Sequence, residues 1–150
     1  MSFLLGMNED TVKSDETSIE KANEESSTTV SAENERELTH EWILEKTGRE
    51  YYQSGSEELA KERFNSALVL FFKALLSFCD AYLLKEQGES PSSHNHRFRI
   101  TEQFFPEVYR LLDKDFPFYA DSYGKLISKS QVEVIKHDAE VMATKAEIKL

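Results

Sequence analysis

Cysteine, proline and glycine are all scarce in this sequence: its 150 residues include one cysteine, three prolines and five glycines. A lone thiol cannot close an intramolecular disulfide, which excludes the disulfide-stapled class of small secreted domains. Cys79 stands within an apolar stretch. We therefore expect this residue to be a small buried hydrophobe and not a reactive thiolate.

Segments that would direct the chain to a membrane are also missing. The apolar run in the opening MSFLLGM is too short for a signal peptide, and it lacks the basic n-region that signal peptides carry. The apolar run at 67–76 is interrupted by Lys73. It is also shorter than the roughly 20 residues that a spanning helix needs. The sequence therefore predicts a cytoplasmic protein.

Basic residues are outnumbered 28 to 18 by acidic ones, and the acidic excess is uneven. Residues 1–38 hold ten acidic and three basic residues, a formal −7 of the total −10, which leaves −3 for residues 39–150. This balance disfavours a role in coating nucleic acid, which needs a basic face. The Glu-, Ser- and Thr-rich composition of residues 1–38 predicts a disordered acidic tail, or alternatively a tail that binds a basic partner.

The longest predicted element is a helix over residues 57–87, with Ser56 as its N-cap and Gly88 at its C-terminal end. This helix is apolar almost all round, as expected of an element with neighbours on most sides. We expect the core to centre on three of its residues, Phe71, Leu75 and Phe78. A shorter helix over 39–54, ended by Gly55, should pair with it as an antiparallel hairpin.

Three further helices are predicted after the long one. Ser93 or Asn95 could cap the next helix, and Pro106 interrupts it and begins a new turn. Residues 113–125 predict a short helix, and Ser128 or Ser130 opens the last one through a capping box. No stretch alternates with the period of a strand. The sequence therefore predicts an all-α fold for residues 39–150: an antiparallel four-helix bundle with an additional short helix.

Polar side chains that could carry chemistry gather after the long helix, at His94, His96, Arg97 and Arg99. The arginines could hold a phosphate or RNA, and a histidine could move a proton near neutral pH. The plainer interpretation is a solvated loop. His94 and His96 offer only two metal ligands, with no third nearby in sequence, so we predict no metal site and no cofactor.

Two other sets of residues are candidates for an interface or a pocket. Lys73, Ser77 and Asp80 share one face of the long helix. They could form a buried polar line that faces a pocket or a dimer mate, or the strip by which the helix meets water. Tyr119 and Tyr123 could bind a base or pin their segment to the bundle.

The segment RFNSALVLFFKALLSFCDAYL resembles the long helix of HEPN domains, in which a small-residue step and a Lys-Ala-Leu sequence recur. Here these are Ser66-Ala67 and Lys73-Ala74-Leu75, and the Phe105-Pro106 break and Asp121-Ser122-Tyr123 fit the same layout. The resemblance covers roughly residues 40–145. It implies a four- or five-helix bundle, often homodimeric. It also implies either a small nucleotidyltransferase as partner or metal-independent ribonuclease activity through an Arg-x4–6-His motif.

That ribonuclease motif is absent, since no histidine follows Arg97, Arg99 or Arg110 before His137. We therefore expect a non-catalytic HEPN-like module. Such a module would dimerise and bind a protein partner, such as a small nucleotidyltransferase, or a nucleotide or RNA. The alternative is a metal-independent ribonuclease that uses the cluster at 94–99.

Overall fold

The computed structural model describes residues 39–150 of the chain. Its elements in chain order are α2 (His40–Ala60), α3 (Phe64–Gln87), α4 (His94–Phe104), α5 (Pro106–Asp121) and α6 (Lys129–Lys145). No strand occurs within residues 39–150. The predicted all-α bundle of four main helices and a short one is confirmed. The predicted acidic tail, residues 1–38, lies outside the described residues.

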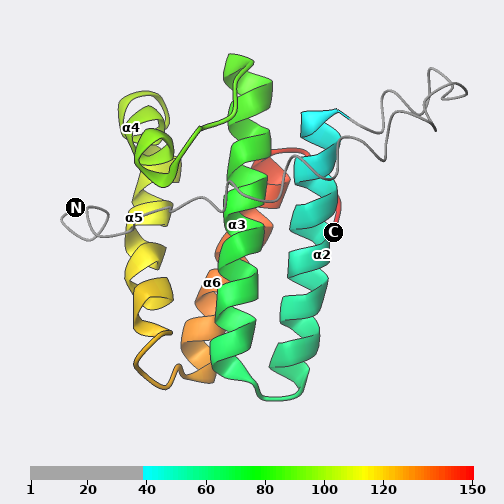
Figure 1. The fold of residues 1–150 in the computed structure, drawn as a ribbon, viewed down its shortest axis with the longest axis vertical. Coiled ribbons are helices and arrows are strands. Elements are labelled where there is room, and N and C mark those ends of the chain that lie inside the picture. Colours follow the sequence, from blue (N-terminus) through cyan, green and yellow to red (C-terminus); the bar gives the residue numbers. More distant parts are fainter. Residues whose placement is uncertain (1–38) are drawn as a thin grey trace, which may run out of the picture. The chain divides into compact units, whose positions relative to one another are not determined.

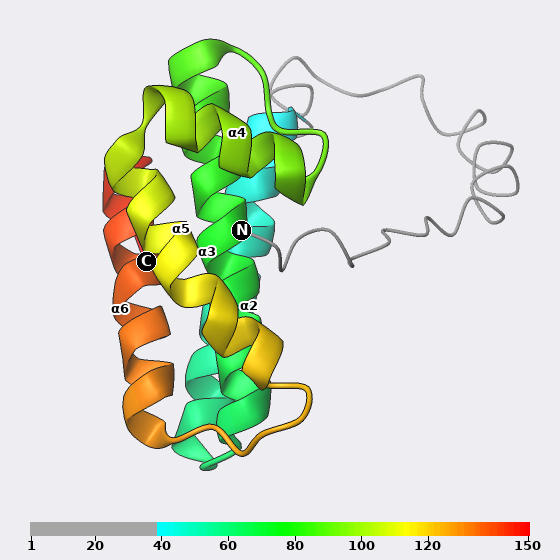
Figure 2. The same ribbon diagram turned by 90° about the vertical axis from the view of Figure 1, so that its left-hand side faces the viewer.

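Helix α3 is the central element of the bundle (Figure 1). It lies between α2 and α5, with α6 behind it, and its closest packing is with α2 and α6. The short α4 crosses near the C-terminal end of α3 and leads into α5 (Figure 2). The predicted core residues Phe71, Leu75 and Phe78 are all fully buried. This agrees with a helix that is apolar on nearly every side because it has neighbours there.

The first helical hairpin turns later than the sequence predicts. Helix α2 continues through Gly55 to Ala60, and α3 begins at Phe64. Ser56 does not cap α3, because its hydroxyl donates to the carbonyl of Tyr52 one turn back. The turn instead lies at 61–63, where Glu62 adopts a left-handed conformation with φ 58°.

The glycines of α2 explain the error, because they serve close packing and not chain reversal. A Cβ placed on Gly48 would lie 2.4 Å from the ring of Phe78, and one on Gly55 would lie 2.9 Å from the ring of Phe71. Both distances are shorter than real Cβ contacts allow, and both rings are fully buried. The two glycines therefore let α2 approach α3 closely enough for these rings to pack against its backbone.

The helices after α3 follow some of the predicted boundaries and not others. Ser93 caps α4 by accepting from the backbone N–H of His96, and Pro106 opens α5 as expected. The prediction of a separate short helix at 113–125 is wrong, because α5 runs unbroken from Pro106 to Asp121 with Pro117 inside it. The buried Phe116 directly precedes this proline, and the half-buried Tyr119 after it stacks on Phe72 of α3, so packing against the core outweighs the lost backbone hydrogen bond.

The last helix begins with the predicted capping box, in which Ser128 and Gln131 bond each other's backbone N–H. The loop before it is fixed to the start of α3 by the side-chain amide of Asn65. This amide donates to the carbonyls of Ser122 and Lys125 at 2.9 and 2.7 Å and accepts from the N–H of Ile127 at 3.0 Å. The loop between α5 and α6 is therefore held to the body of the bundle.

Helix α3 is long and apolar enough, by length and composition alone, to cross a membrane. The prediction considered only residues 67–76 and therefore underestimated the length of this apolar helix. However, 56% of its most apolar window is buried inside the bundle, as in the core helix of a soluble protein. Among residues 39–150 it is the one helix that meets this test.

Candidate functional site

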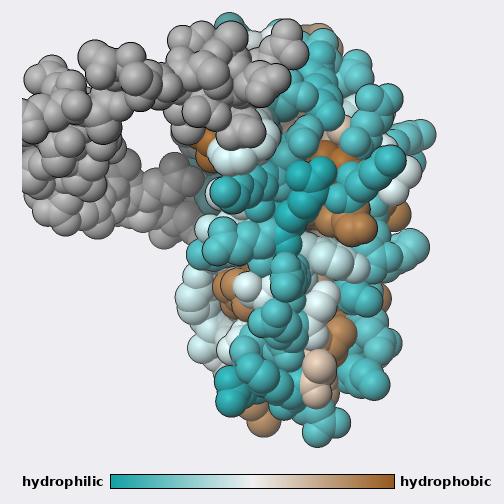
Figure 3. Space-filling model, turned by 90° about the vertical axis from the view of Figure 1, so that its right-hand side faces the viewer, coloured by the Kyte–Doolittle hydropathy of each residue, from teal (hydrophilic) through white to brown (hydrophobic). Residues whose placement is uncertain are grey.

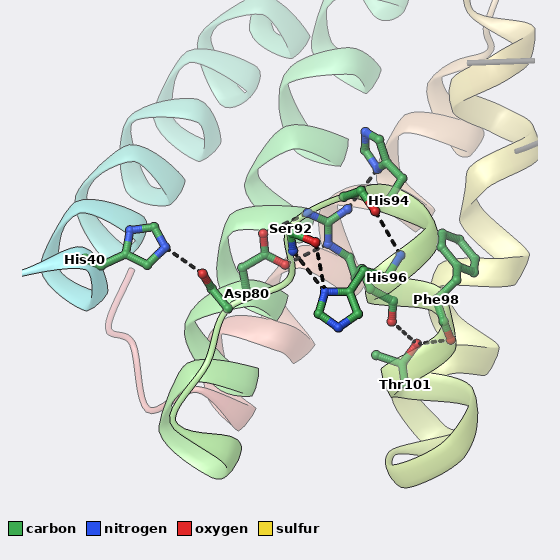
Figure 4. A network of polar contacts seen from close by, with 10 residues as sticks. His40, Asp80, Ser92, His94, His96, Phe98 and Thr101 are labelled. Atoms are coloured by element: carbon green, nitrogen blue, oxygen red, sulfur yellow. Dashed lines mark hydrogen bonds and ion pairs between the residues drawn. The ribbon is translucent and has the colours of Figure 1, made fainter. Parts of the chain in front are cut away.

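The centre of the candidate site is an ion pair between α3 and α4 (Figure 4). The guanidinium of Arg97 donates through Nε to Asp80 Oδ1 at 2.7 Å and through Nη2 to Asp80 Oδ2 at 2.8 Å. Arg97 and Asp80 are only 8% and 9% exposed. Bidentate geometry of this kind is the strongest form of arginine–carboxylate contact. The pair therefore fastens α4 to α3.

One histidine contacts this ion pair, and two others bond the connection between α3 and α4. His94 Nδ1 lies 2.8 Å from Arg97 Nη1, and His96 Nδ1 accepts from the backbone N–H of Ser92 at 3.1 Å. At the near end of α2, His40 Nε2 lies 2.8 Å from the hydroxyl of Ser90 (Figure 4). The ion pair therefore joins α4 to α3, and a separate contact joins α2 to the connection between them.

Local sequence explains why these side chains meet. Gly88 ends α3 in a left-handed conformation with φ 79°, which turns the chain back toward the bundle. His94 and Arg97 then stand three residues apart in the first turn of α4, on one face of the helix. Arg99, two residues beyond Arg97, points about 200° away from it around the helix and is exposed. The structure therefore brings together His94, His96 and Arg97, but not Arg99.

The predicted stripe on α3 is divided between different environments. Lys73 is exposed and lies 5.7 Å from the centre of the Tyr51 ring of α2, whereas Ser77 is half-buried and Asp80 is buried. The stripe therefore does not form one continuous polar line. Only Asp80 joins the site, and from α3 alone the sequence could not indicate that Arg97 would be its partner.

The two candidate tyrosines lie at the opposite end of the bundle. Tyr119 stacks on Phe72 with ring centres 4.6 Å apart, and its hydroxyl lies 2.9 Å from that of Tyr123. Burial and this hydroxyl contact raise the pKa of Tyr119 to about 12. Tyr119 therefore fixes α5 to the core, while Tyr123 remains 75% exposed.

A second polar cluster, between α5 and α6, was not predicted. Asp115 is completely buried and Asp138 nearly so, and Lys114 Nζ lies 3.8 Å from Asp115 Oδ1 and 2.9 Å from Asp138 Oδ2. Burial and the neighbouring Asp138 raise the pKa of Asp115 to about 9. The contact with Asp138 raises the pKa of Lys114. The sequence did contain one signal of burial for the two aspartates. Each stands next to a core residue, Phe116 or Ala139, on the apolar face of its helix.

Replacing Asp115 by asparagine should stabilise the protein, and more so as pH rises. The folded state holds a proton on Asp115 that the unfolded chain releases above its ordinary pKa of about 4, so wild-type stability falls between pH 4 and 9. Asparagine keeps the shape of the side chain but does not ionise. Urea unfolding at several pH values would measure the difference. A variant whose stability follows wild type at every pH would contradict this account of Asp115.

The described residues also bear on metal and small-molecule binding. Within residues 39–150, no three His, Cys, Asp or Glu side chains are grouped so that they could hold a metal ion. A pocket of about 390 Å³ opens beside the α2–α3 turn, where Leu59 and Phe64 meet Lys129 and Lys136 of α6. Burial strongly raises the pKa of the Cys79 thiol, which keeps it protonated and unreactive as predicted.

Comparison with known proteins adds no assignment. No model of a known protein family matches this sequence. A search of curated proteins found no match either. The resemblance to HEPN domains therefore stays a prediction that rests on the residues quoted for it.

Proposed function

We propose that residues 39–150 form a non-catalytic HEPN-like module in the cytoplasm. In this proposal the module dimerises and binds a protein partner, such as a small nucleotidyltransferase, or a nucleotide or RNA. The observation that carries the proposal is the use made of Arg97. Its guanidinium is buried and bonded to both oxygens of Asp80, so its charge is balanced within the fold. A cation held in this way supports the bundle and is poorly placed to bind a phosphate.

A surface suited to a protein partner lies on the loop between α5 and α6. Tyr123 is 75% exposed and Leu126 is 96% exposed, although Asn65 holds this loop to α3. Large apolar side chains on a fixed support favour binding, because little conformational freedom remains to be lost on association. By contrast, the face on the α2 side is mostly hydrophilic, with scattered hydrophobic residues (Figure 3).

The mass of the protein in solution tests this proposal. Sedimentation equilibrium should give twice the chain mass of 17.3 kDa at micromolar concentration. Replacing both Tyr123 and Leu126 by serine should weaken self-association at least about tenfold, as expected for loss of central apolar contacts. A matched control replaces the exposed Val134 of α6 by serine. A wild-type protein that stays monomeric and captures no partner or nucleotide would contradict the proposal.

The second candidate function, a metal-independent ribonuclease, is favoured by one observation. His94 and Arg97 are in direct contact at 2.8 Å, and a histidine beside a cation is the pair that such cleavage uses. The opposing consideration is that this same contact engages the arginine that holds α4 on α3 through Asp80.

A further inference from the structure

The pocket beside the turn between α2 and α3 lies at the end of the bundle where α6 begins (Figure 2). Its volume of about 390 Å³ falls at the lower end of the range of small-molecule sites. Three apolar residues, two glutamates and two lysines line it together with Ser56. The lining thus combines an apolar surface with charges of both signs.

The apolar part of the lining comes from both sides of the turn. Leu59 belongs to the last turn of α2 and Phe64 is the first residue of α3, and both are half-buried. Ala60, which ends α2, is exposed. The open surface of these residues remains in water unless a ligand covers it. An apolar group in the pocket would therefore be stabilised by burial.

A negative charge of the pocket is held in an unfavourable backbone conformation. Glu62 has φ 58°, in the left-handed region that glycine adopts without strain and glutamate does not. Within residues 39–150 no ion pair balances its carboxylate, because the neighbouring Lys61 and Arg63 both pair with Glu58, at 3.9 and 3.6 Å. A strained residue that places an unpaired carboxylate at a pocket indicates that the side chain has a function there.

A positive charge of the pocket stands at the first position of α6. Lys129 is exposed and lies at the positive end of the helix dipole, where a cation is unfavourable, and the first turn of α6 has no acidic residue to compensate it. Glu133 stands one turn further on, but lysine before glutamate is the weaker order for such a pair, and no ion pair joins the two. Lys136, the other lysine of the pocket, already lies 3.7 Å from Glu140.

The presence of both signs decides the class of ligand. A simple anion would be repelled by the two glutamates of the lining, and a simple cation by its two lysines. We propose that the pocket binds a free α-amino acid with an apolar side chain. Its carboxylate pairs with Lys129, its ammonium pairs with Glu62, and its side chain packs against Leu59 and Phe64. This site is separate from the dimer and the partner proposed above and does not depend on them.

NMR titration of the nitrogen-15-labelled full chain with L-leucine tests the site. The amide signals of residues 59–64 and 129–136 should shift with saturation below about 10 mM, a range suited to a small ligand in an open pocket. Three probes serve as matched controls. N-acetyl-L-leucine lacks the ammonium, L-leucinamide lacks the carboxylate and glycine lacks the side chain, and each should bind at least about tenfold more weakly. L-leucine that does not bind, or that binds no more tightly than these probes, would overturn the proposal.

Replacing Glu62 by glycine separates binding from folding. The variant loses the carboxylate and relieves the left-handed backbone, so the midpoint of thermal unfolding should not fall, whereas affinity for L-leucine should fall at least about tenfold. The matched control is Glu147→Gly, because Glu147 is also left-handed, with φ 59°, but lies at the other end of α6. This control should bind L-leucine like wild type. A Glu62→Gly variant that keeps wild-type affinity would contradict the proposal.

A second variant keeps the proposal testable if Glu62→Gly does not fold. Lys129→Gln changes an exposed side chain and removes a cation from an unfavourable position, so the fold should be kept. Its affinity for L-leucine should fall at least about tenfold, while its already weak binding of L-leucinamide should be unchanged, because that probe has no carboxylate to lose a partner. Wild-type affinity for L-leucine in this variant would overturn the proposal.

Discussion

Replacing Arg97 by alanine is expected to lower the free energy of unfolding by about 3–5 kcal/mol, because one member of a buried ion pair is removed. Asp80 would be left with both oxygens buried and without the two guanidinium bonds of 2.7 and 2.8 Å. The unfolded chain solvates this carboxylate freely, so the whole cost falls on the folded state. Urea denaturation at neutral pH would measure it.

A matched control and a double-mutant cycle distinguish lost pairing from general damage to α4. Arg99→Ala removes an exposed arginine from the same helix and should change stability by less than about 0.5 kcal/mol. Adding Asp80→Ala to Arg97→Ala should recover part of the loss, because the uncompensated charge is then gone. If Arg97→Ala costs no more than Arg99→Ala, the pair does not hold α4 and the interpretation of the site fails.

Leu75→Ala is expected to cost about 2–5 kcal/mol, through lost burial and the cavity left behind. Leu75 is fully buried at the middle of α3, and so are Phe71, four residues before it, and Phe78, three residues after it. These rings pack against the glycines of α2, so the surrounding helices have little freedom to close the cavity. Thermal or urea unfolding of the variant beside wild type gives the number.

The control for this prediction removes the same atoms from a position in solvent. Leu126 is 96% exposed, so Leu126→Ala should leave the free energy of unfolding within about 0.5 kcal/mol of wild type. A cost below about 1 kcal/mol for Leu75→Ala would place Leu75 on a surface and contradict the packing of α3.

Helix boundaries were predictable where the signal is local. Ser93, Pro106 and the capping box at Ser128 were each found from residues within one turn, and the structure confirms them. Gly55 was wrongly predicted to end a helix, and the short helix predicted at 113–125 was wrongly separated from the residues before it, because both outcomes depend on distant residues. The ring of Phe71 packs where a Cβ on Gly55 would lie. The buried Phe116 before Pro117 and the stacking of Tyr119 on Phe72 after it hold α5 to the core as one helix.

The candidate site was predictable in its residues but not in its pairing. Composition alone singled out His94, His96 and Arg97 as unusual neighbours. The partner of Arg97, however, is Asp80, which is 17 residues earlier and on another helix. No pattern within α3 distinguishes a carboxylate that meets water from one that meets a guanidinium. The buried Asp115 and Asp138 were missed for the same reason, since polar residues are expected to be exposed.

The central claim is that the module is non-catalytic, and cleavage of single-stranded RNA by purified protein tests it most directly. Metal-free cleavage needs a base for the 2′-hydroxyl and a cation for the phosphorane, and the candidates, His94 and Arg97, are bonded to each other and to Asp80. With chelator present, wild type should cleave no faster than the His94→Ala, His96→Ala double variant. Cleavage by wild type that disappears in the double variant would contradict the claim and place an active site at the start of α4.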